Sequence, residues 1–544
     1  MALDSLLLGG KGSGMTSFFS IEFFVIFLPV CILIYSLVPK KAKKYTLLAL
    51  SFCFFWFISG KLIVYLLLSI LSVHYFGLWI DRIYTQRDEA VKLAEKAERK
   101  EIKNRYKKKA RYVLLFAVIV HIGILLVLKY TEFFMNNINT VFAKLSVPVE
   151  FDIPKYLMPI GISFFSLQAV SYITDIYRGT VKADDNIFRL ALFMSFFPQI
   201  VEGPICKYSQ TAEQLWNVKA IDFDNLSMGL QRFLFGMLKK IVIADRLNPL
   251  VENVFSNYND YHGGIIAAGA VLYTVQLYMD FSGSMDAVTG VAEIFGVVMP
   301  ENFSRPFFSK TISEFWKRWH ITLGVWFKDY IFYPVSMSKP MKNLTVASRK
   351  KLGNHFGPLL SGAVALFCVW ISNGLWHGAR WSYIFFGLYH FALILGGNII
   401  APAVKKVNTK LKINQDAFVY KLVQVLRTTL LVVIGELFFR AEGFRNGAAM
   451  FKKMITDFSF SGFNGDMLVN LGVDALDLII AAVTVGIVFI VSVLNEKGIT
   501  VRRELKGKNI VLRWTVLIGL ILYIVIFGAY GPGYVPVDPM YANF

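Results

Sequence analysis

Two histidines in apolar, tryptophan-rich surroundings are the side chains of this sequence best suited to acid–base chemistry. His320 lies in the segment 300–336, PENFSRPFFSKTISEFWKRWHITLGVWFKDYIFYPVS, and His377 lies in WISNGLWHGARW, residues 370–381. A neutral imidazole can take a proton from an attacking hydroxyl, and a second one can orient the reacting group or stabilise developing charge. A lone histidine here could merely satisfy a backbone carbonyl, but a pair with further polar neighbours favours a catalytic function.

Charged side chains surround the first histidine. Lys317, Arg318 and Lys328 could attract a phosphorylated molecule, because ammonium and guanidinium groups bind phosphate oxygens. Glu314 stands three and four residues before two of them, a spacing that predicts ion pairs along one helix. A structural role is therefore favoured for Glu314 and for Asp329.

Other motifs for catalysis or binding have no support in this sequence. It contains neither GxxxxGK[ST] nor GxGxxG after a strand, so nucleotide hydrolysis and dinucleotide binding are not indicated. The four cysteines stand apart in or beside apolar segments, without a CxxC or a Cys/His cluster. Neither a disulfide nor a metal site is expected.

The chain that must position these residues has the composition of a membrane protein. Of its 544 residues, 56% are hydrophobic and 17% are charged, against roughly 45–50% and about 25% in soluble domains. The net charge of +20 comes from Lys and Arg in short loops between apolar runs, which indicates the positive-inside rule and no nucleic-acid partner. The predicted fold is an all-α polytopic membrane protein in the lipid bilayer.

Apolar runs that could cross a bilayer, or nearly so, recur along the chain. They cover 18–38, 45–58, 62–80, 112–130, 158–179, 264–280, 363–371, 383–400, 422–439, 478–494 and 512–527. The basic stretches 39–44, 81–111 and 496–508 are expected on the cytosolic side, and 81–111 is expected to be helical. The N-terminus and the C-terminal tail are then expected outside the cytoplasm.

Some segments depart from a plain apolar span. The polar side chains of 158–179 predict a helix inside the bundle, and 190–200 should break at Pro198 into a re-entrant or kinked segment. Residues 228–244 carry Arg232 and two adjacent lysines, which favours an interfacial or tilted helix. DFSGSMD, residues 280–286, predicts a glycine-broken turn, and 131–155 predicts an exterior loop with a short helix.

Three regions are expected along the chain. Residues 1–14 look unrelated to the rest of the chain and are interpreted as a leader or an added segment, with Met15 as the natural start. Residues 15–530 form one transmembrane domain, and 531–544 form a tail. An exposed tail is the usual expectation, yet its aromatic residues could return it to a cavity.

Several long motifs resemble the bacterial membrane-bound O-acyltransferase (MBOAT) family, in particular the branch of the alginate and peptidoglycan O-acetyltransferase membrane subunits. The resemblance is carried by the segment 300–335 followed by NGLWHGARWSYIFFGLYH, and by MPIGISFFSLQAVSYITDIYRG, FFPQIVEGPICKYSQ and MDFSGSMDAVTGVAEIFG. It covers nearly the whole chain from Met15. It implies a helical bundle with a central funnel and short re-entrant and interfacial helices, in the plasma (inner) membrane of a bacterium.

The resemblance also implies an activity. His377 of the WHG motif matches the family's catalytic position, and His320 of the RWH motif matches its partner. The expected acyl donor is acetyl-CoA from the cytosol, and the residues expected to contact it are Asn373, Lys317, Arg318 and Trp376. The acceptor is expected to be a cell-envelope or extracellular polysaccharide, reached through an extracytoplasmic transferase of the SGNH type.

The tail AYGPGYVPVDPMYANF resembles the family's C-terminal tyrosine motif, in which the tyrosine is thought to receive the acyl group. Tyr541 is the matching position, although PMYANF departs from the more aromatic ending common in the family. The hypothesis is that His377, oriented by His320 and Asn373, deprotonates Tyr541 for attack on the thioester. Two alternatives stay open: D-alanyl transfer from a carrier protein to teichoic acid, and a transporter or flippase of a lipid-linked or acylated sugar.

Overall fold

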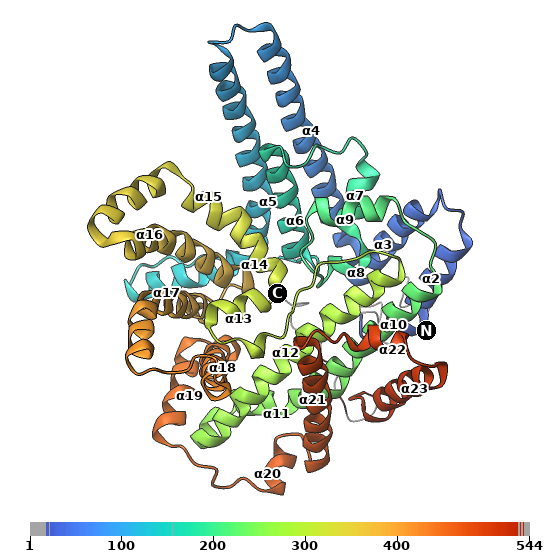
Figure 1. Ribbon diagram of the computed structural model, residues 1–544, viewed down its shortest axis with the longest axis vertical. Coiled ribbons are helices and arrows are strands. Elements are labelled where there is room, and N and C mark those ends of the chain that lie inside the picture. Colours follow the sequence, from blue (N-terminus) through green and yellow to red (C-terminus); the bar gives the residue numbers. More distant parts are fainter. Residues whose placement is uncertain (1–17, 21, 155, 531–533, 535–536, 538–544) are drawn as a thin grey trace. The chain divides into compact units, whose positions relative to one another are not determined.

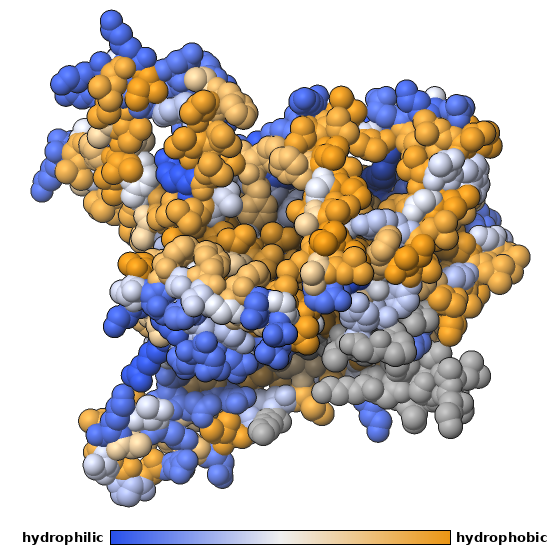
Figure 2. All heavy atoms as spheres, turned by 90° about the horizontal axis from the view of Figure 1, so that it is seen from below, coloured by the Kyte–Doolittle hydropathy of each residue, from blue (hydrophilic) through white to orange (hydrophobic). Residues whose placement is uncertain are grey.

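The computed structural model describes residues 18–20, 22–154, 156–530, 534 and 537. All regular structure in this part of the chain is helical. Eight of its helical segments are long and apolar enough to cross a membrane: Lys43–Leu93, Arg99–Lys144, Gly263–Ile294, Lys339–His377, Trp381–Lys410, Phe418–Arg440, Ala475–Glu496 and Ile510–Phe527. The predicted all-α polytopic membrane fold is thus confirmed. Figure 2 shows hydrophobic side chains over much of one face, with hydrophilic side chains gathered in separate patches.

The chain divides into two compact units. Among the described residues, the first comprises residues 18–233 and Met285–Pro300, and the second comprises Leu234–Ser284 and residues 301–537. Helices α10 (Phe223–Met237) and α12 (Gly263–Ile294) contribute residues to both units.

In the first unit, two long helices form a hairpin. Helix α4 (Ile63–Leu93) and helix α5 (Arg99–Lys144) pack side by side, and α6 (Ile162–Arg178) packs against both (Figure 1). The basic stretch 81–111 is helical apart from a short break, as predicted, but 131–144 continues α5 and is no loop. The predicted helix was too short because it stopped where the apolar run stops, near Tyr130. The amphipathic residues that follow continue the same helix.

The remaining helices of the first unit pack against α4, against α6 or against one another. They are η2 (Glu22–Phe27), α2 (Leu28–Leu37), α3 (Lys43–Ser59), η3 (Gly60–Leu62), α7 (Ile187–Ser195), α8 (Phe197–Ile200) and α9 (Tyr208–Trp216). The expected break near Pro198 is present between α7 and α8. Helix α6 buries its polar side chains, as predicted for a helix in a bundle interior: Ser163, Ser166, Gln168, Ser171 and Asp175.

The second unit holds both histidines. Its first elements are η4 (Leu238–Ala244), α11 (Asp245–Ser256), η5 (Tyr258–Asp260) and most of α12, followed by η6 (Pro306–Phe308), α13 (Ile312–Arg318), α14 (Ile321–Phe327), η7 (Lys328–Phe332) and α15 (Tyr333–Ser336). Its later helices are α16 (Lys339–His377), α17 (Trp381–Lys410), α18 (Phe418–Arg440), α19 (Phe444–Thr456), α20 (Gly465–Asn470), α21 (Ala475–Glu496), α22 (Val501–Lys506) and α23 (Ile510–Phe527). In sequence, α13 and α14 precede the α16–α17 hairpin. Helix α13 packs against α17, and η7 and α15, which follow α14, pack against α16 (Figure 1).

The expected glycine-broken turn at 280–286 is wrong, because α12 runs through it without a break. A Cβ atom on Gly283 would lie 2.9 Å from the carbonyl oxygen of Gly236. The glycine therefore serves a close helix–helix approach and not a turn. The adjacent lysine pair that predicted an interfacial position for 228–244 is buried in protein.

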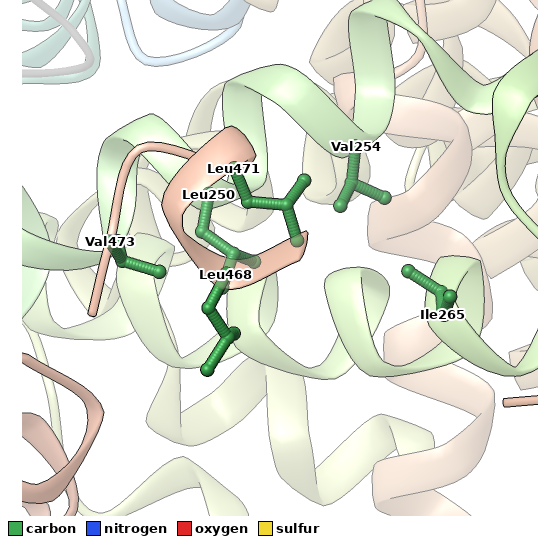
Figure 3. Packing of buried hydrophobic residues seen from close by; sticks show 6 residues of the cluster. All are labelled: Leu250, Val254, Ile265, Leu468, Leu471 and Val473. Carbon is green, nitrogen blue, oxygen red and sulfur yellow. The ribbon is translucent and has the colours of Figure 1, made fainter. Parts of the chain in front are cut away.

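One apolar cluster ties the short helix α20 to the rest of the second unit. Leu468, Leu471 and Val473 pack with Leu250 and Val254 of α11 and with Ile265 of α12 (Figure 3). Burial of such aliphatic side chains contributes roughly 1.5–3 kcal/mol each. The cluster thereby holds the connection between α19 and α21 against the helices that precede the site.

Candidate active site

A cavity of about 380 Å³ in the second unit has both histidines in its wall. Most of its lining comes from residues 313–328 and from the last third of α16. The wall is largely apolar, and its polar lining residues are Ser313, Lys317, His320, Lys328, Asn373 and His377. A mostly apolar cavity with a few convergent polar groups is typical of a small-molecule site.

The backbone around His320 is set by a helix cap and a sharp turn. The Thr311 hydroxyl accepts a hydrogen bond from the Glu314 amide at 3.1 Å and so caps α13. Between α13 and α14, His320 adopts a left-handed conformation, with φ 45° and ψ 52°. A residue other than glycine rarely adopts this conformation, and such residues cluster at functional sites.

Asn302 holds the His320 ring in one tautomer. Its Oδ1 atom lies 3.2 Å from His320 Nδ1 and accepts from the Thr322 amide at 3.1 Å and from the Thr322 hydroxyl at 2.9 Å. A backbone amide can only donate, so this Asn302 atom is an acceptor and His320 Nδ1 carries the hydrogen. The other nitrogen, Nε2, is then the basic one.

His320 is neutral at physiological pH. Burial lowers the pKa of His320 from 6.5 to about 3, because desolvation disfavours the charged ring. The residue lies outside the eight candidate spans. The ring can therefore accept a hydrogen bond or a proton at Nε2 while Nδ1 stays bound to Asn302.

His377 is positioned by a close packing of two helices. It is the last residue of α16, and α17 begins at Trp381. A Cβ atom on Gly374 would lie 2.5 Å from the Tyr383 carbonyl oxygen, and one on Gly387 would lie 2.3 Å from the Trp370 carbonyl oxygen. These glycines allow the helix contact that directs the end of α16 to the cavity.

Aromatic rings fix the two imidazoles relative to each other. The Trp376 ring contacts both, with centroids 5.7 Å from His320 and 5.0 Å from His377. Phe281 packs edge-on against His320 at 4.8 Å, and Phe439 packs edge-on against His377 at 5.1 Å. Tyr383 and Phe386 also lie near His377, with centroids at 6.3 Å and 6.2 Å.

The other residues predicted to contact an acyl donor fall into two groups. Asn373 and Lys317 line the cavity, and Asn373 Oδ1 is buried without a hydrogen-bond partner among the described residues. Arg318 instead pairs with Glu314 at 2.9 Å and with Glu496 at 3.1 Å. The helical ion pair predicted from spacing is confirmed, and a donor contact by Arg318 stays a prediction.

Two residues of the site were missed in the sequence. Asn302 carried no signal, because its contact with His320 depends on the turn between α12 and α13. His390 accepts a hydrogen bond from Trp316 Nε1 at 3.2 Å and stacks on Trp370 at 5.4 Å, and both tryptophans line the cavity. A buried histidine in an apolar helix is the same signal that marked the other two.

Tyr541 lies outside the described residues. In the part of the tail that is described, Gly528–Tyr530, Tyr534 and Val537 are placed. Within the described chain, three or more His, Cys, Asp or Glu side chains come together nowhere in a way that could hold a metal ion.

Comparisons with known proteins show which family the chain belongs to. Residues 181–349, which include Asn302 and His320, match the model of MBOAT, the membrane-bound O-acyltransferase family. The probable alginate O-acetylase AlgI of Pseudomonas syringae pv. tomato is 31% identical over 462 residues, which cover 84% of this chain and 79% of that protein. The peptidoglycan O-acetyltransferase of Helicobacter pylori is 27% identical over 84% of this chain and 82% of that protein. The teichoic acid D-alanyltransferase of Bacillus subtilis is 31% identical over 45% of this chain and 60% of that protein.

The likeness to AlgI extends well beyond the segment that the family model matches, and it includes most of both units. The chain that has this likeness is helical in its described regular structure, has eight candidate spans, and has two imidazoles in the wall of its cavity. The chain is a multi-pass membrane acyltransferase and belongs to the membrane-bound O-acyltransferase family.

Proposed function

We propose that this enzyme transfers an acetyl group from acetyl-CoA to Tyr541, for delivery to a cell-envelope or extracellular polysaccharide. The observation that carries the proposal is the pair of imidazoles in the wall of one cavity, one of them held as a defined tautomer by Asn302. The names of its relatives, an alginate O-acetylase and a peptidoglycan O-acetyltransferase, support an acetyl group and a polysaccharide acceptor.

In the proposed reaction, His377 takes the proton of the Tyr541 hydroxyl as the phenolic oxygen attacks the thioester carbonyl. The carbon–sulfur bond then breaks, the CoA thiolate leaves, and it receives the proton from His377. A base is needed because a phenol with a pKa of about 10 is a poor nucleophile at neutral pH. The product is O-acetyl-tyrosine, and His320 orients His377 for both proton transfers.

The cavity wall offers groups for the donor. Asn373 stands one helical turn before His377 and presents a buried amide, which is suited to a hydrogen bond with the acyl-carrying end of the donor. Lys317, also in the wall, is suited to the CoA phosphates, because its ammonium is a mobile point charge. The Trp376 indole contacts both catalytic rings and limits how a thioester can enter between them.

The acetyl-tyrosine is proposed to pass its group to a separate SGNH-type transferase outside the cytoplasm. This requires the enzyme in the plasma (inner) membrane with its tail on the outer side, as the basic loops predict. One alternative is D-alanyl transfer from a carrier protein to teichoic acid. The likeness to a teichoic acid D-alanyltransferase favours it, but that likeness covers less than half of this chain.

The test is incubation of the purified full-length enzyme with radiolabelled acetyl-CoA, followed by peptide mass spectrometry. Label on Tyr541 that disappears in His377→Ala is the expected result. Tyr530→Phe, which removes a different hydroxyl of the same tail, is the matched control and should keep the label. Label that persists in Tyr541→Phe would contradict the relay. The absence of label from a folded sample, together with label from a D-alanyl carrier protein, would establish the alternative.

A further inference from the structure

The C-terminal segment contacts a buried lysine of the π-helix η4. Lys240, whose side chain is 1% exposed, lies 2.7 Å from Asp245 Oδ1 and 2.8 Å from Asp280 Oδ1. Its Nζ atom also donates to the carbonyl oxygen of Val537 at 3.2 Å. An ammonium has three donors, so a carbonyl of the tail takes the third place around a buried cation.

A second cation holds the beginning of the same segment. Arg246 donates to the carbonyl oxygen of Phe527, pairs with Asp477, and lies 3.4 Å from the Tyr534 hydroxyl. The Ala529 amide donates to the Ile241 carbonyl oxygen at 3.0 Å. Four residues of the segment, Phe527, Ala529, Tyr534 and Val537, are therefore held by three residues of η4 and α11. Turns of π-helix such as η4 are frequent at functional sites.

The charges explain why the Val537 contact matters. Burial and the nearby Asp280 raise the pKa of the Asp245 carboxyl to about 6, and the Lys240 ammonium opposes this rise. The ionised form of Asp245 is therefore stabilised by the ammonium beside it. A buried ammonium is costly unless all its donors are satisfied. The two aspartates balance its charge as ion pairs, and the tail carbonyl accepts a hydrogen bond from it.

We propose that Lys240 and Arg246 are positioning residues that dock the enzyme's own C-terminal segment and thereby bring Tyr541 to the reaction. This inference rests on the proposed role of Tyr541 as acetyl acceptor. Tyr541 follows Val537 by four residues, and four residues of chain span at most about 14 Å. Holding Val537 therefore confines the phenol to a short tether, which raises its effective concentration at a nearby thioester.

The docking is tested first without any acetyl donor, by hydrogen–deuterium exchange of the full-length enzyme. In Lys240→Met the tail loses the hydrogen bond from the ammonium to Val537. The docking that protects the Ala529 amide is then weakened, and exchange in the peptide that contains Ala529 should become faster by about tenfold or more. Lys240→Arg keeps a cation with donors and should restore slow exchange. Lys453→Met is the matched control, since the Lys453 ammonium donates to the carbonyl oxygens of Tyr258 and Asn259, and it should leave this peptide unchanged.

Exchange in α16 peptides separates a local effect from general unfolding and should be the same in all four proteins. Unchanged exchange of the tail in Lys240→Met would overturn the proposal. If Lys240→Met does not fold, Tyr534→Ala decides, because it removes the Arg246 contact without touching the buried cluster. Faster tail exchange in that variant supports the docking, and unchanged exchange overturns it.

Acetylation is then measured separately. Loss of docking should lower the maximal rate of acetyl-tyrosine formation by about tenfold, while the KM for acetyl-CoA stays within the error of the wild-type value. A variant whose cavity is destabilised would change both the maximal rate and the KM for acetyl-CoA. Faster tail exchange with no acetylation in the wild-type enzyme would leave the docking standing and remove the proposed function.

Discussion

Asn302 determines which nitrogen of His320 is basic. Its oxygen accepts from a backbone amide, so it cannot be turned around to offer its NH₂ group to the ring. Through this buried contact Asn302 sets the tautomer of His320, a role that its position in the sequence did not indicate. The same logic applies wherever a histidine is oriented by a group that is itself fixed by the backbone.

Replacing this residue should affect the rate more than the fold. In Asn302→Ala, His320 loses the acceptor for Nδ1–H, and acetyl transfer should fall by about 100-fold or more, the size of a lost acid–base contribution. Asn302→Asp keeps an acceptor oxygen and should retain more activity than the alanine variant. Equal activities of the two variants in the acetyl-CoA labelling assay would contradict the tautomer argument.

The low pKa of His320 predicts how stability depends on pH. The unfolded chain binds a proton at this ring below pH 6.5, whereas the folded one does so only near pH 3. The contribution of the neutral ring to the free energy of unfolding is therefore fully present above pH 6.5. It is lost as the pH falls from 6.5 towards 3, by at most about 1.4 kcal/mol per pH unit.

Thermal unfolding in detergent at pH 4 to 7 measures this dependence. In His320→Asn the slope of the melting temperature with pH should be reduced. His355→Asn, which removes an exposed histidine, is the control and should keep the slope of the wild type. A slope that survives in His320→Asn would assign the acid sensitivity to other groups.

At the level of helices, small residues decide how closely the site's elements approach. Gly374 and Gly387 bring the backbones of α16 and α17 together, and Gly283 does the same for α12 and the end of α10. The last third of α16 carries Asn373, Trp376 and His377, so the α16–α17 contact sets the positions of three site residues at once.

Adding one methyl group at these contacts should be costly. Gly374→Ala and Gly387→Ala would place Cβ at 2.5 Å and 2.3 Å from carbonyl oxygens, and each should lower the free energy of unfolding by about 1–3 kcal/mol. The same change at Gly396 of α17, where a Cβ atom meets nothing within 4 Å, should raise it by about 0.4–1 kcal/mol. Equal effects at the tight and the open glycines in detergent unfolding experiments would refute this account.

For the whole molecule, the distribution of basic residues predicts its orientation in the membrane. The break between α4 and α5 lies in the basic stretch 81–111, which should face the cytosol. In intact cells, an impermeant thiol reagent should therefore modify Asn543→Cys but not Glu98→Cys, with the modification located by peptide mass spectrometry. Modification of Glu98→Cys in intact cells would reverse the orientation, and with it the delivery of acetyl groups to the outer side.

The sequence by itself determined the helical class, the membrane location, and the pair of histidines. Each of these depends on residues close together in the chain. Apolar runs of sufficient length must form helices in lipid, because backbone groups there need internal partners. The Glu314–Arg318 pair follows from a spacing of four residues on one helix.

Only the tertiary structure decided which distant groups meet. Gly283 serves a helix contact because Gly236 faces it. Arg318 pairs with Glu496 and does not line the cavity. Lys240 can be buried because two aspartates and a carbonyl of the tail contact its ammonium. These outcomes depend on how helices far apart in the sequence pack, since the cost of burying a charge is offset only by the partners that packing brings to it.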